Sequence, residues 1–497
     1  MKKLIALALA STMLLSGCGQ AASGSSQSAA ASGSASGSEE MPNLVMNFAY
    51  SEVPTDLQKI EDAINEITTE KIGCTVTLNA YTYGNIADQQ TLILSSPSEQ
   101  WDLMCGQFRS GISSVVGRGQ LTPLNDLLDE YGQDIVATLG EDYIKAGSVN
   151  GECYEITTCR NLAGQECVLF DKAIIDELGL ADQVAAVTTY ADLTPIFEAI
   201  HEAHPEMYVT ASSGTKPNLL IAGIDGQDIL GDSLGVLMDA SDPTVSNLFE
   251  SEEYKELCEL TKSWNEAGYI YPDITTDDSN NGAALMKNGL CASFFQAYKP
   301  GALVENANTA GKELVAAIVN QPLAYTSSVQ NWGWAIPTNA VYPEKAMQLL
   351  NLLFSDADLI NLLSYGIEGE HWQLSDDGFA EPGPNAAGYS DKKTWLSGNA
   401  YIGYVWQGDD ADLYEQLKAF NSDAEKSVAL GFSFDNSALT AEYTAMQSVI
   451  AQYRMLLEWG FVDDVQATLD EFNQALYEAG LQKYMDEKQA QLTAFVG

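Results

Sequence analysis

The chain has 497 residues, of which 69 are Asp or Glu and 23 are Lys or Arg, so its formal net charge is −46. This acidity argues against nucleic acid and anionic lipid as partners of the folded part, because both bind basic surfaces. It also favours a soluble monomer. The length is too great for one hydrophobic core, and the ordinary apolar content of 46% predicts two or three folded domains.

The chain begins with a basic and then apolar leader. Two lysines precede an apolar stretch over residues 4–15, which is too short to span a membrane. The leader closes with Leu15-Ser16-Gly17-Cys18. Small residues before a cysteine resemble the lipobox of bacterial lipoproteins, which implies that residues 1–17 are removed and that Cys18 is lipidated. The mature protein would then be anchored at the extracytoplasmic face of a cell membrane, as on a Gram-positive surface. The alternative is an ordinary secretory leader with a chance cysteine.

A tether follows the leader. Residues 19–40 consist almost wholly of Gly, Ser, Ala and Gln, a composition that cannot bury a core. We therefore expect a flexible segment over residues 18–42, with a root-mean-square reach of about 25 Å.

In chain order, short strands then alternate with helices. The predicted strands cover residues 44–48, 74–78 and 101–105, and the predicted helices cover residues 56–71 and 86–94. The alternation resumes at 167–200 and at 331–366, where a helix with an apolar stripe begins at Pro343. This order is typical of parallel β units covered by helices and predicts an α/β fold. The last hundred residues are predicted to be mainly helical.

Seven cysteines remain after Cys18. They are Cys74, Cys105, Cys153, Cys159, Cys167, Cys258 and Cys291. An odd number cannot all pair, and the sequence has neither a CxxC motif nor a Cys/His zinc spacing. We expect most of them to be free thiols, with one bridge among Cys153, Cys159 and Cys167 as the alternative.

Several short motifs follow one another along the chain. They are Trp101-Asp102-Leu103-Met104, the segment 119–128 (GQLTPLNDLL), the segment 150–156 (NGECYEI), Phe170-Asp171-Lys172 with the segment 190–193 (YADL), and the segment 331–337 (NWGWAIP). Their order resembles that of the family 1 extracellular solute-binding proteins, the receptor subunits of ATP-driven sugar importers. The segment 365–369 and the helical end of the chain resemble the lipoprotein subgroup associated with oligosaccharides such as aldouronates, whose C-terminal domain has no known function. One departure is Thr157 or Thr158, where the family usually carries proline.

The resemblance covers nearly all of residues 43–497. It implies an α/β, two-lobed fold of the type II periplasmic-binding-protein kind, with crossing hinge strands, additional C-terminal helices and ligand bound between the lobes. We expect the first lobe to contain residues 43–158 and 332–370. The second lobe would contain residues 166–328 and 373–497.

A sugar-binding cleft needs flat apolar faces and planar polar groups. Trp332 and Trp334 lie two residues apart on a predicted strand, so they should face the same side of it, and we expect at least one to line the cleft. The alternative places both in the core. The other aromatic candidates are Trp372 at a second crossing, Tyr298 after a short strand, Tyr50 at the end of the first strand, and Tyr404 and Trp406 in a Gly/Asp-rich loop.

Arginine is scarce, and two arginines are candidates for the site. Arg109 follows the third predicted strand, and Arg160 lies near the first crossing. Either guanidinium could bind the carboxylate of an acidic sugar. The alternative for each is a salt bridge with one of the many acidic side chains.

Three segments match motifs of enzymes or metal sites only incompletely. The segment 231–235 matches G-x-S-x-G but follows polar residues rather than a buried strand. The segment 201–204 is one residue short of a zinc motif, and the segment 277–282 lacks the closing Glu of a calcium loop. The sequence therefore predicts no catalysis, no cofactor and no metal.

Together these features predict a lipid-anchored receptor that captures an oligosaccharide between two lobes. Closure of the lobes would let it deliver the ligand to the permease subunits of an ABC importer. The alternatives are a receptor for peptides or another solute on the same fold, a surface carbohydrate-active enzyme, and an adhesin or scaffold without a cleft.

Overall fold

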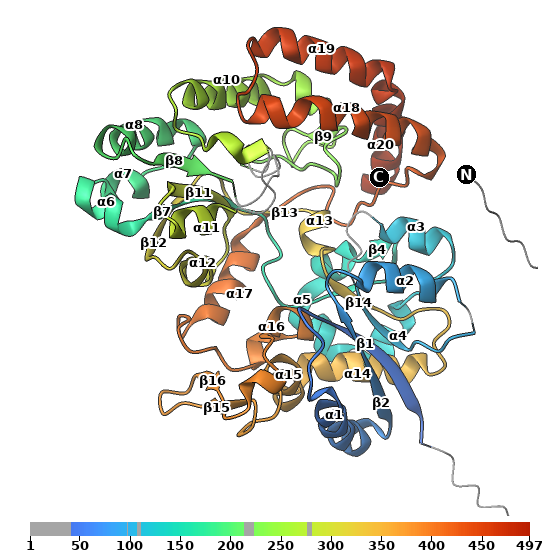
Figure 1. The fold of residues 1–497 in the computed structure, drawn as a ribbon. Helices are drawn as coiled ribbons and strands as arrows, with labels where there is room; N and C mark the ends of the chain where they lie inside the picture. The colour runs from blue at the N-terminus through green and yellow to red at the C-terminus, as the bar shows by residue number, and fades with distance from the viewer. Residues whose placement is uncertain (1–40, 97, 107–110, 213–222, 276–280) are drawn as a thin grey trace, which may run out of the picture. The chain divides into compact units, whose positions relative to one another are not determined.

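A computed structural model describes residues 41–96, 98–106, 111–212, 223–275 and 281–497 (Figure 1). The leader, the tether, Cys18, Arg109 and most of the calcium-loop-like segment lie outside these residues. No helix among the described residues is long and apolar enough to cross a membrane.

A first sheet has five strands in the order β2-β1-β3-β14-β6. They are β1 (Asn43–Tyr50), β2 (Thr75–Thr82), β3 (Leu103–Gly106), β6 (Ile156–Thr157) and β14 (Gly333–Ala335). Strands β2 and β3 run parallel to β1, whereas β14 runs antiparallel to both β3 and β6. The three strands expected before residue 106 are therefore confirmed.

Helices cover this sheet with the apolar faces that the sequence predicts. The main ones are α1 (Leu57–Ile72), α2 (Ile86–Leu94), α4 (Asn125–Tyr131), α5 (Gln133–Ala146), α14 (Pro343–Ser355) and α15 (Ala357–Tyr365). Gly73, in the left-handed region at φ 64°, ends α1, and Pro343 begins α14. The expected stripe of α14 buries Leu349, Leu350 and Leu353 in the core of this sheet.

A second sheet has four strands in the order β12-β7-β11-β8. They are β7 (Glu166–Asp171), β8 (Tyr208–Ala211), β11 (Cys291–Ala297) and β12 (Leu314–Ile318). Only β11 and β8 pair in parallel, whereas β7 pairs antiparallel with both β11 and β12. The expectation of parallel units fails here because apolar runs locate strands without fixing their direction.

Helices also surround the second sheet. They are α6 (Lys172–Leu178), α7 (Ala181–Ala185), α8 (Thr194–Ala203), α10 (Glu252–Glu266), α11 (Gly282–Lys287) and α12 (Ala302–Ala310). Its core includes Phe170, Phe197, Trp264 and Phe295, all fully buried.

The chain passes between the two sheets several times. Residues 158–165 lead from β6 to β7, and residues 319–332 lead from β12 back to β14. The two passages are paired, because the amides of Gly164 and Leu323 each donate to the carbonyl of the other at 2.9 and 3.0 Å. A later passage adds β17 (Glu425–Lys426), which pairs with β13 (Leu323–Ala324). Crossing strands therefore join the two sheets, as expected.

The end of the chain is helical, also as expected. It contains α17 (Leu413–Asp423), α18 (Thr440–Glu458), α19 (Val465–Glu478) and α20 (Leu481–Val496). The last three pack with α10 in one hydrophobic cluster that includes Leu469, Phe472 and Leu481 (Figure 1).

The exact lobe boundaries stay a prediction, and packing favours one change to them. Tyr389 and Leu396 are buried in the same hydrophobic cluster as the helices of the first sheet. Leu396 lies in the short helix α16 (Thr394–Ser397), which contacts α15. We therefore propose that the first lobe extends to about residue 402, beyond the expected end at 370.

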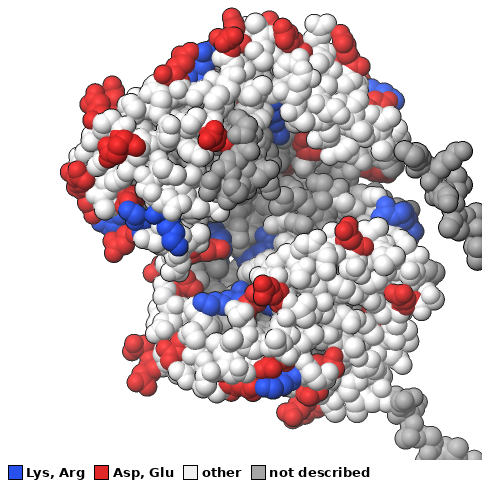
Figure 2. Space-filling view, viewed as in Figure 1, with Lys and Arg blue, Asp and Glu red and all other residues white. Residues whose placement is uncertain are grey.

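All seven described cysteines are free and buried, which confirms the expectation of free thiols. Figure 2 shows acidic side chains spread over the visible face, with basic side chains along a hollow in it.

Candidate ligand-binding site

Two pockets meet at Arg160 and Asn161, in the passage between the sheets. The smaller has a volume of about 370 Å³ and is called the indole pocket here, because Trp395 and Trp406 line it. The larger has a volume of about 700 Å³ and is called the wide pocket. Both volumes lie in the range of small-molecule sites. Since the pockets share two residues, they can hold adjacent parts of one extended ligand.

The indole pocket takes its walls from both sides of the passage. Trp395 belongs to α16, which packs against the first sheet's helix α15. Val304, Glu305 and Asn308 belong to α12, which packs on β12 of the second sheet. A ligand in this pocket would therefore touch groups carried by both sheets.

A cluster of three aromatic rings stands beside this pocket. Trp332 contacts Tyr83 and Trp395 with ring centroids 5.7 and 5.9 Å apart, and the rings of Tyr83 and Trp395 stack at 6.1 Å. Tyr83 follows the carboxyl end of β2, and Trp332 precedes the antiparallel β14. Both therefore lie at the sheet edge where α/β folds bind ligands.

Neither Trp332 nor Trp334 lines the two pockets, although the strand alternation predicts that at least one of them does. Trp334 is fully buried in β14 and stacks on Phe48 at 5.8 Å, so it offers no face to a ligand. Trp332 lies just before the strand, where the two-residue period does not apply, and supports Trp395 rather than lining either pocket itself. Our sequence reasoning missed Trp395 and Tyr83.

Of the two aromatic candidates near residue 400, Trp406 lines a pocket and Tyr404 does not. Trp406 lines the indole pocket, and the Lys392 ammonium lies 3.9 Å from its ring centroid. Tyr404 is 40% exposed but lines neither pocket. Trp372 is buried, and its indole N–H donates to the Gly366 carbonyl at 2.9 Å, which gives it a structural part.

Tyr50 is also buried instead of facing a pocket. The Lys393 ammonium lies 3.2 Å from its ring centroid and is surrounded further by the rings of Phe48 and Tyr389. Burial lowers the pKa of Lys393 to about 7, and the nearby Asp391 carboxylate partly opposes this shift. Tyr50 therefore helps enclose a buried amine in the first sheet's core.

The wide pocket is rich in polar groups. Half-buried Tyr298 lines it, and its predicted contact with a ligand stays a prediction. Arg160 lines both pockets, and its guanidinium donates to the carbonyls of Asn161, Ser328 and Val329 at 2.8 to 3.0 Å. These hydrogen bonds hold the Arg160 side chain across the two paired passages. From the sequence, we instead expected its guanidinium to bind a sugar carboxylate or an acidic side chain.

Two buried carboxyl groups lie near this junction. Burial raises the pKa of Glu166, which lines the wide pocket, to about 8. Burial likewise raises the pKa of Glu155 to about 8, although the positive charge of Arg160 opposes the shift. Both groups are therefore mainly protonated at neutral pH. A neutral carboxyl can donate one hydrogen bond and accept others, as sugar hydroxyls require.

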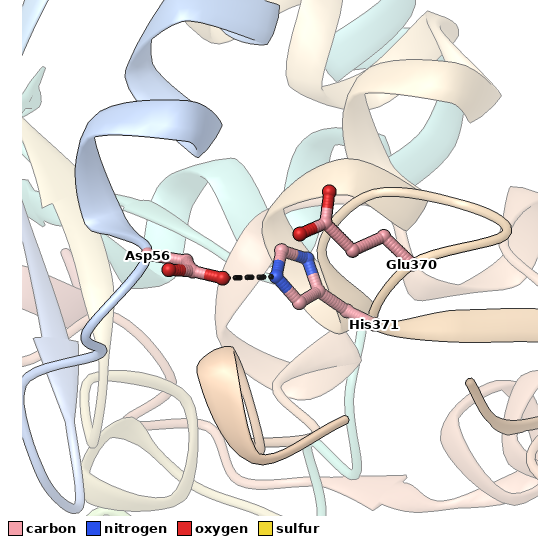
Figure 3. Close-up of side chains that lie close together, drawn as sticks. All are labelled: Asp56, Glu370 and His371. Atoms are coloured by element: carbon pink, nitrogen blue, oxygen red, sulfur yellow. Dashed lines mark hydrogen bonds and ion pairs between the residues drawn. The ribbon is translucent and has the colours of Figure 1, made fainter. Parts of the chain in front are cut away.

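A cluster of Asp56, Glu370 and His371 has the residue types of a metal site (Figure 3). His371 Nδ1 accepts the Ile367 amide at 3.0 Å, so its Nε2 carries the proton toward Asp56 at 3.1 Å. The pKa of Asp56 is lowered by this bond and by Lys59, whose ammonium contacts both carboxylates. With both imidazole nitrogens engaged, the cluster fits a structural link between α1 and the segment after α15 better than a metal centre.

The G-x-S-x-G match lies in a loop rather than between a strand and a helix. Ser233 lines the wide pocket, but none of the chain's three histidines is among that pocket's described lining residues. No histidine therefore stands beside Ser233 among the described residues of this pocket.

Comparisons with known proteins agree with this fold. A family model described as "Bacterial extracellular solute-binding protein" matches residues 54–359, and one described as "Domain of unknown function (DUF3502)" matches residues 428–497. A protein of Streptococcus pneumoniae serotype 4 named "Carbohydrate ABC transporter substrate-binding protein" is 24% identical over 97% of this chain and 95% of its own length.

Solved structures are similar over most of their length. The N-glycan transport solute binding protein of Streptococcus pneumoniae has a TM-score of 0.79 at 23% identity, covering 92% of this chain and 99% of that one. An extracellular solute-binding protein of Bifidobacterium longum subsp. infantis has a TM-score of 0.63 at 15% identity, covering 93% and 99%. The likeness confirms the two-lobed α/β fold.

Proposed function

The chain belongs to the bacterial extracellular solute-binding protein family, and from this membership we propose that it is the receptor of an ABC importer and binds an oligosaccharide in the indole and wide pockets. The family acts outside the cytoplasm. Its model covers residues 54–359, more than half of the chain.

One observation carries the proposal: a pocket lined by two indoles shares Arg160 and Asn161 with a neighbouring pocket lined by amides and hydroxyls. Indole faces bind the C–H surface of pyranose rings, while amides, hydroxyls and guanidinium groups bind their hydroxyls. A linear or branched sugar chain presents both kinds of surface along its length.

The names of similar proteins support a ligand that contains mannose and N-acetylglucosamine. The pneumococcal N-glycan transport protein was solved in complex with Man1GlcNAc and with Man5GlcNAc, and those structures have TM-scores of 0.70 and 0.67 to this chain. The named pneumococcal relative supports the wider class of carbohydrates. We therefore place short N-glycan fragments first among the candidate ligands.

The remaining parts of the proposal concern anchoring and delivery. Lipidation at Cys18 and the tether would hold the monomeric receptor at the membrane, close to its permease. Ligand binding would favour the closed arrangement of the lobes in proportion to its extra affinity for that arrangement. In this proposal no bond is made or broken, as the names of the matching family and of the pneumococcal relative suggest.

Calorimetric titration with a panel of ligands tests the proposal. The panel contains Man1GlcNAc, Man5GlcNAc, an acidic xylo-oligosaccharide and a peptide of similar mass. We expect at least one oligosaccharide to bind, to raise the melting temperature and to be recovered unchanged. Binding of the peptide alone would contradict the proposal, and so would release of shorter sugars from a bound oligosaccharide.

A further inference from the structure

The region that matches a domain of unknown function begins at residue 428 and contains α18, α19 and α20. Helix α18 is two-sided. Its Met446 and Leu457 are fully buried in the cluster shared with α19 and α20. A neighbouring stripe of α18, of which Tyr443 and Ile450 also pack against that cluster, lines the wide pocket at residues Tyr443, Gln447, Ile450, Ala451, Arg454 and Met455. These positions follow the period of an α-helix, so one continuous face of α18 forms a pocket wall.

Helix α20 is hydrogen-bonded to a loop that lines another part of the wide pocket. The loop over residues 229–233 lines it, and Asp232 in that loop accepts hydrogen bonds from Tyr484 at 2.5 Å and Lys488 at 2.6 Å. The buried Lys488 ammonium also donates to the carbonyls of Leu234 and Gly235 at 2.8 and 3.1 Å. Two hydrogen bonds thus fix this loop to α20, and two more fix the residues that follow it.

The loop needs such support, because its backbone is strained. Leu230 and Ser233 have φ angles of 46° and 61°, in the left-handed region that side chains other than glycine disfavour. A strained conformation persists only when its surroundings determine it. The C-terminal helices therefore shape the wide pocket both directly, through α18, and indirectly, through this loop.

From these contacts we infer that the C-terminal domain of unknown function is part of the ligand-binding site: α18 supplies one wall of the wide pocket, and α20 fixes the loop beside it. Three of the six side chains on this wall carry polar groups: the Gln447 amide, the Tyr443 hydroxyl and the Arg454 guanidinium, which also pairs with Glu458 at 2.6 Å. They suit sugar hydroxyls beyond the unit bound in the indole pocket. The inference rests on the proposed function and assigns this domain the recognition of the extended part of an oligosaccharide.

Two neighbouring positions on α18 provide the test. Both Ala451 and the adjacent Gln452 are exposed, but Ala451 lines the wide pocket whereas Gln452 lines neither pocket. Successive residues on a helix point about 100° apart, so Ala451→Trp fills the pocket while Gln452→Trp adds the same ring to the surface. Neither change touches the buried face of the helix.

The affinity of both variants for Man5GlcNAc is measured by calorimetry, with the melting temperature as a check on folding. We expect Ala451→Trp to weaken binding at least tenfold and Gln452→Trp to leave it within about twofold. A smaller variant, Gln447→Ala, should weaken binding about two- to tenfold, as for the loss of one hydrogen bond.

The possible outcomes separate the two proposals. If the wild-type protein binds Man5GlcNAc and Ala451→Trp and Gln447→Ala bind it equally well, the C-terminal domain is not part of the site and the inference is wrong. If the wild-type protein binds no oligosaccharide at all, the proposed function fails, and the inference fails with it.

Discussion

The indole pocket and the wide pocket meet at the same two residues but have different walls. Trp395 and Trp406 give the first broad apolar faces, and Lys392 and Asp409 also line it. The described lining of the wide pocket contains no tryptophan and instead offers tyrosines, amides, Arg160 and Arg454. Indole faces bind a sugar ring whatever the pattern of its hydroxyls, whereas directional polar groups distinguish one hydroxyl pattern from another. The indole pocket therefore differs from the wide pocket in its two indole faces, while both pockets contain charged and amide groups.

The two pockets also depend on different parts of the chain. The indole pocket rests on α12, α16 and the loop around Trp406, while the wide pocket needs the C-terminal helices. The following changes are designed to affect one pocket and leave the other unchanged.

The largest effect is expected for Lys488→Met. The change leaves Asp232 without its cation in a part-buried site, which costs about 3 kcal/mol or more of unfolding free energy. Lys483→Met on the same helix is the control, because Lys483 is exposed and its solvent-screened ion pair with Glu442 contributes little to stability. Urea unfolding measures both, and equal stability of the two variants would contradict the assigned role of Lys488.

Trp395→Ala should weaken oligosaccharide binding by about 1–3 kcal/mol, roughly 5- to 150-fold, because an aromatic face is lost from the indole pocket. Trp395→Phe should lose less, since a smaller ring remains. Calorimetry with Man1GlcNAc gives both values. Unchanged affinity in Trp395→Ala would remove the basis for assigning stacking to this pocket.

Glu166→Gln tests the buried carboxyl of the wide pocket. Its pKa of about 8 in the folded state exceeds the ordinary value of 4.5, so the folded protein holds a proton that the unfolded chain releases. Wild-type stability should therefore fall as pH rises from about 4.5 to 8, by up to about 1.4 kcal/mol per pH unit. Glu166→Gln should lack this contribution and become the more stable protein near pH 8.

Unfolding in urea at pH 5, 6.5 and 8 measures this difference. The exposed Glu313 provides the control variant Glu313→Gln. A constant difference between Glu166→Gln and the wild type across the three pH values would show that Glu166 is ionised in the folded protein.

The smallest effect is expected for Tyr404→Ala. Tyr404 is exposed and lines neither pocket, and its hydrogen bonds from Tyr365 and Tyr414 go to its backbone carbonyl, which alanine keeps. Affinity for Man1GlcNAc should stay within about twofold. A large loss of affinity would contradict this expectation and would favour the sequence prediction that Tyr404 contacts the ligand.

The sequence was a good guide to the elements of the fold. Apolar spacing located β1, β2, α1 and α14, and Gly73 and Pro343 correctly marked a helix end and a helix start. The order of motifs, rather than any local pattern, indicated the two-lobed fold. Strand direction in the second sheet was not available from apolar runs, because they look alike in parallel and antiparallel pairs.

The candidate site was harder to predict from sequence. Trp406, Tyr298 and Arg160 line the pockets, but Trp334, Trp372 and Tyr50 are buried. An aromatic residue at a strand end can serve the core or a cleft, and only the segments that cover it decide between them. Trp395 sits on the four-residue helix α16, too short to show a period, so its place follows from tertiary packing alone.

The seven buried thiols have a consequence for disulfide exchange. Burial raises the pKa of Cys74 to about 11 and those of Cys153 and Cys291 to about 12, so almost no thiolate forms at neutral pH. Disulfide exchange requires a thiolate that a second sulfur can reach. In the folded protein these buried thiols are therefore poorly placed for disulfide exchange.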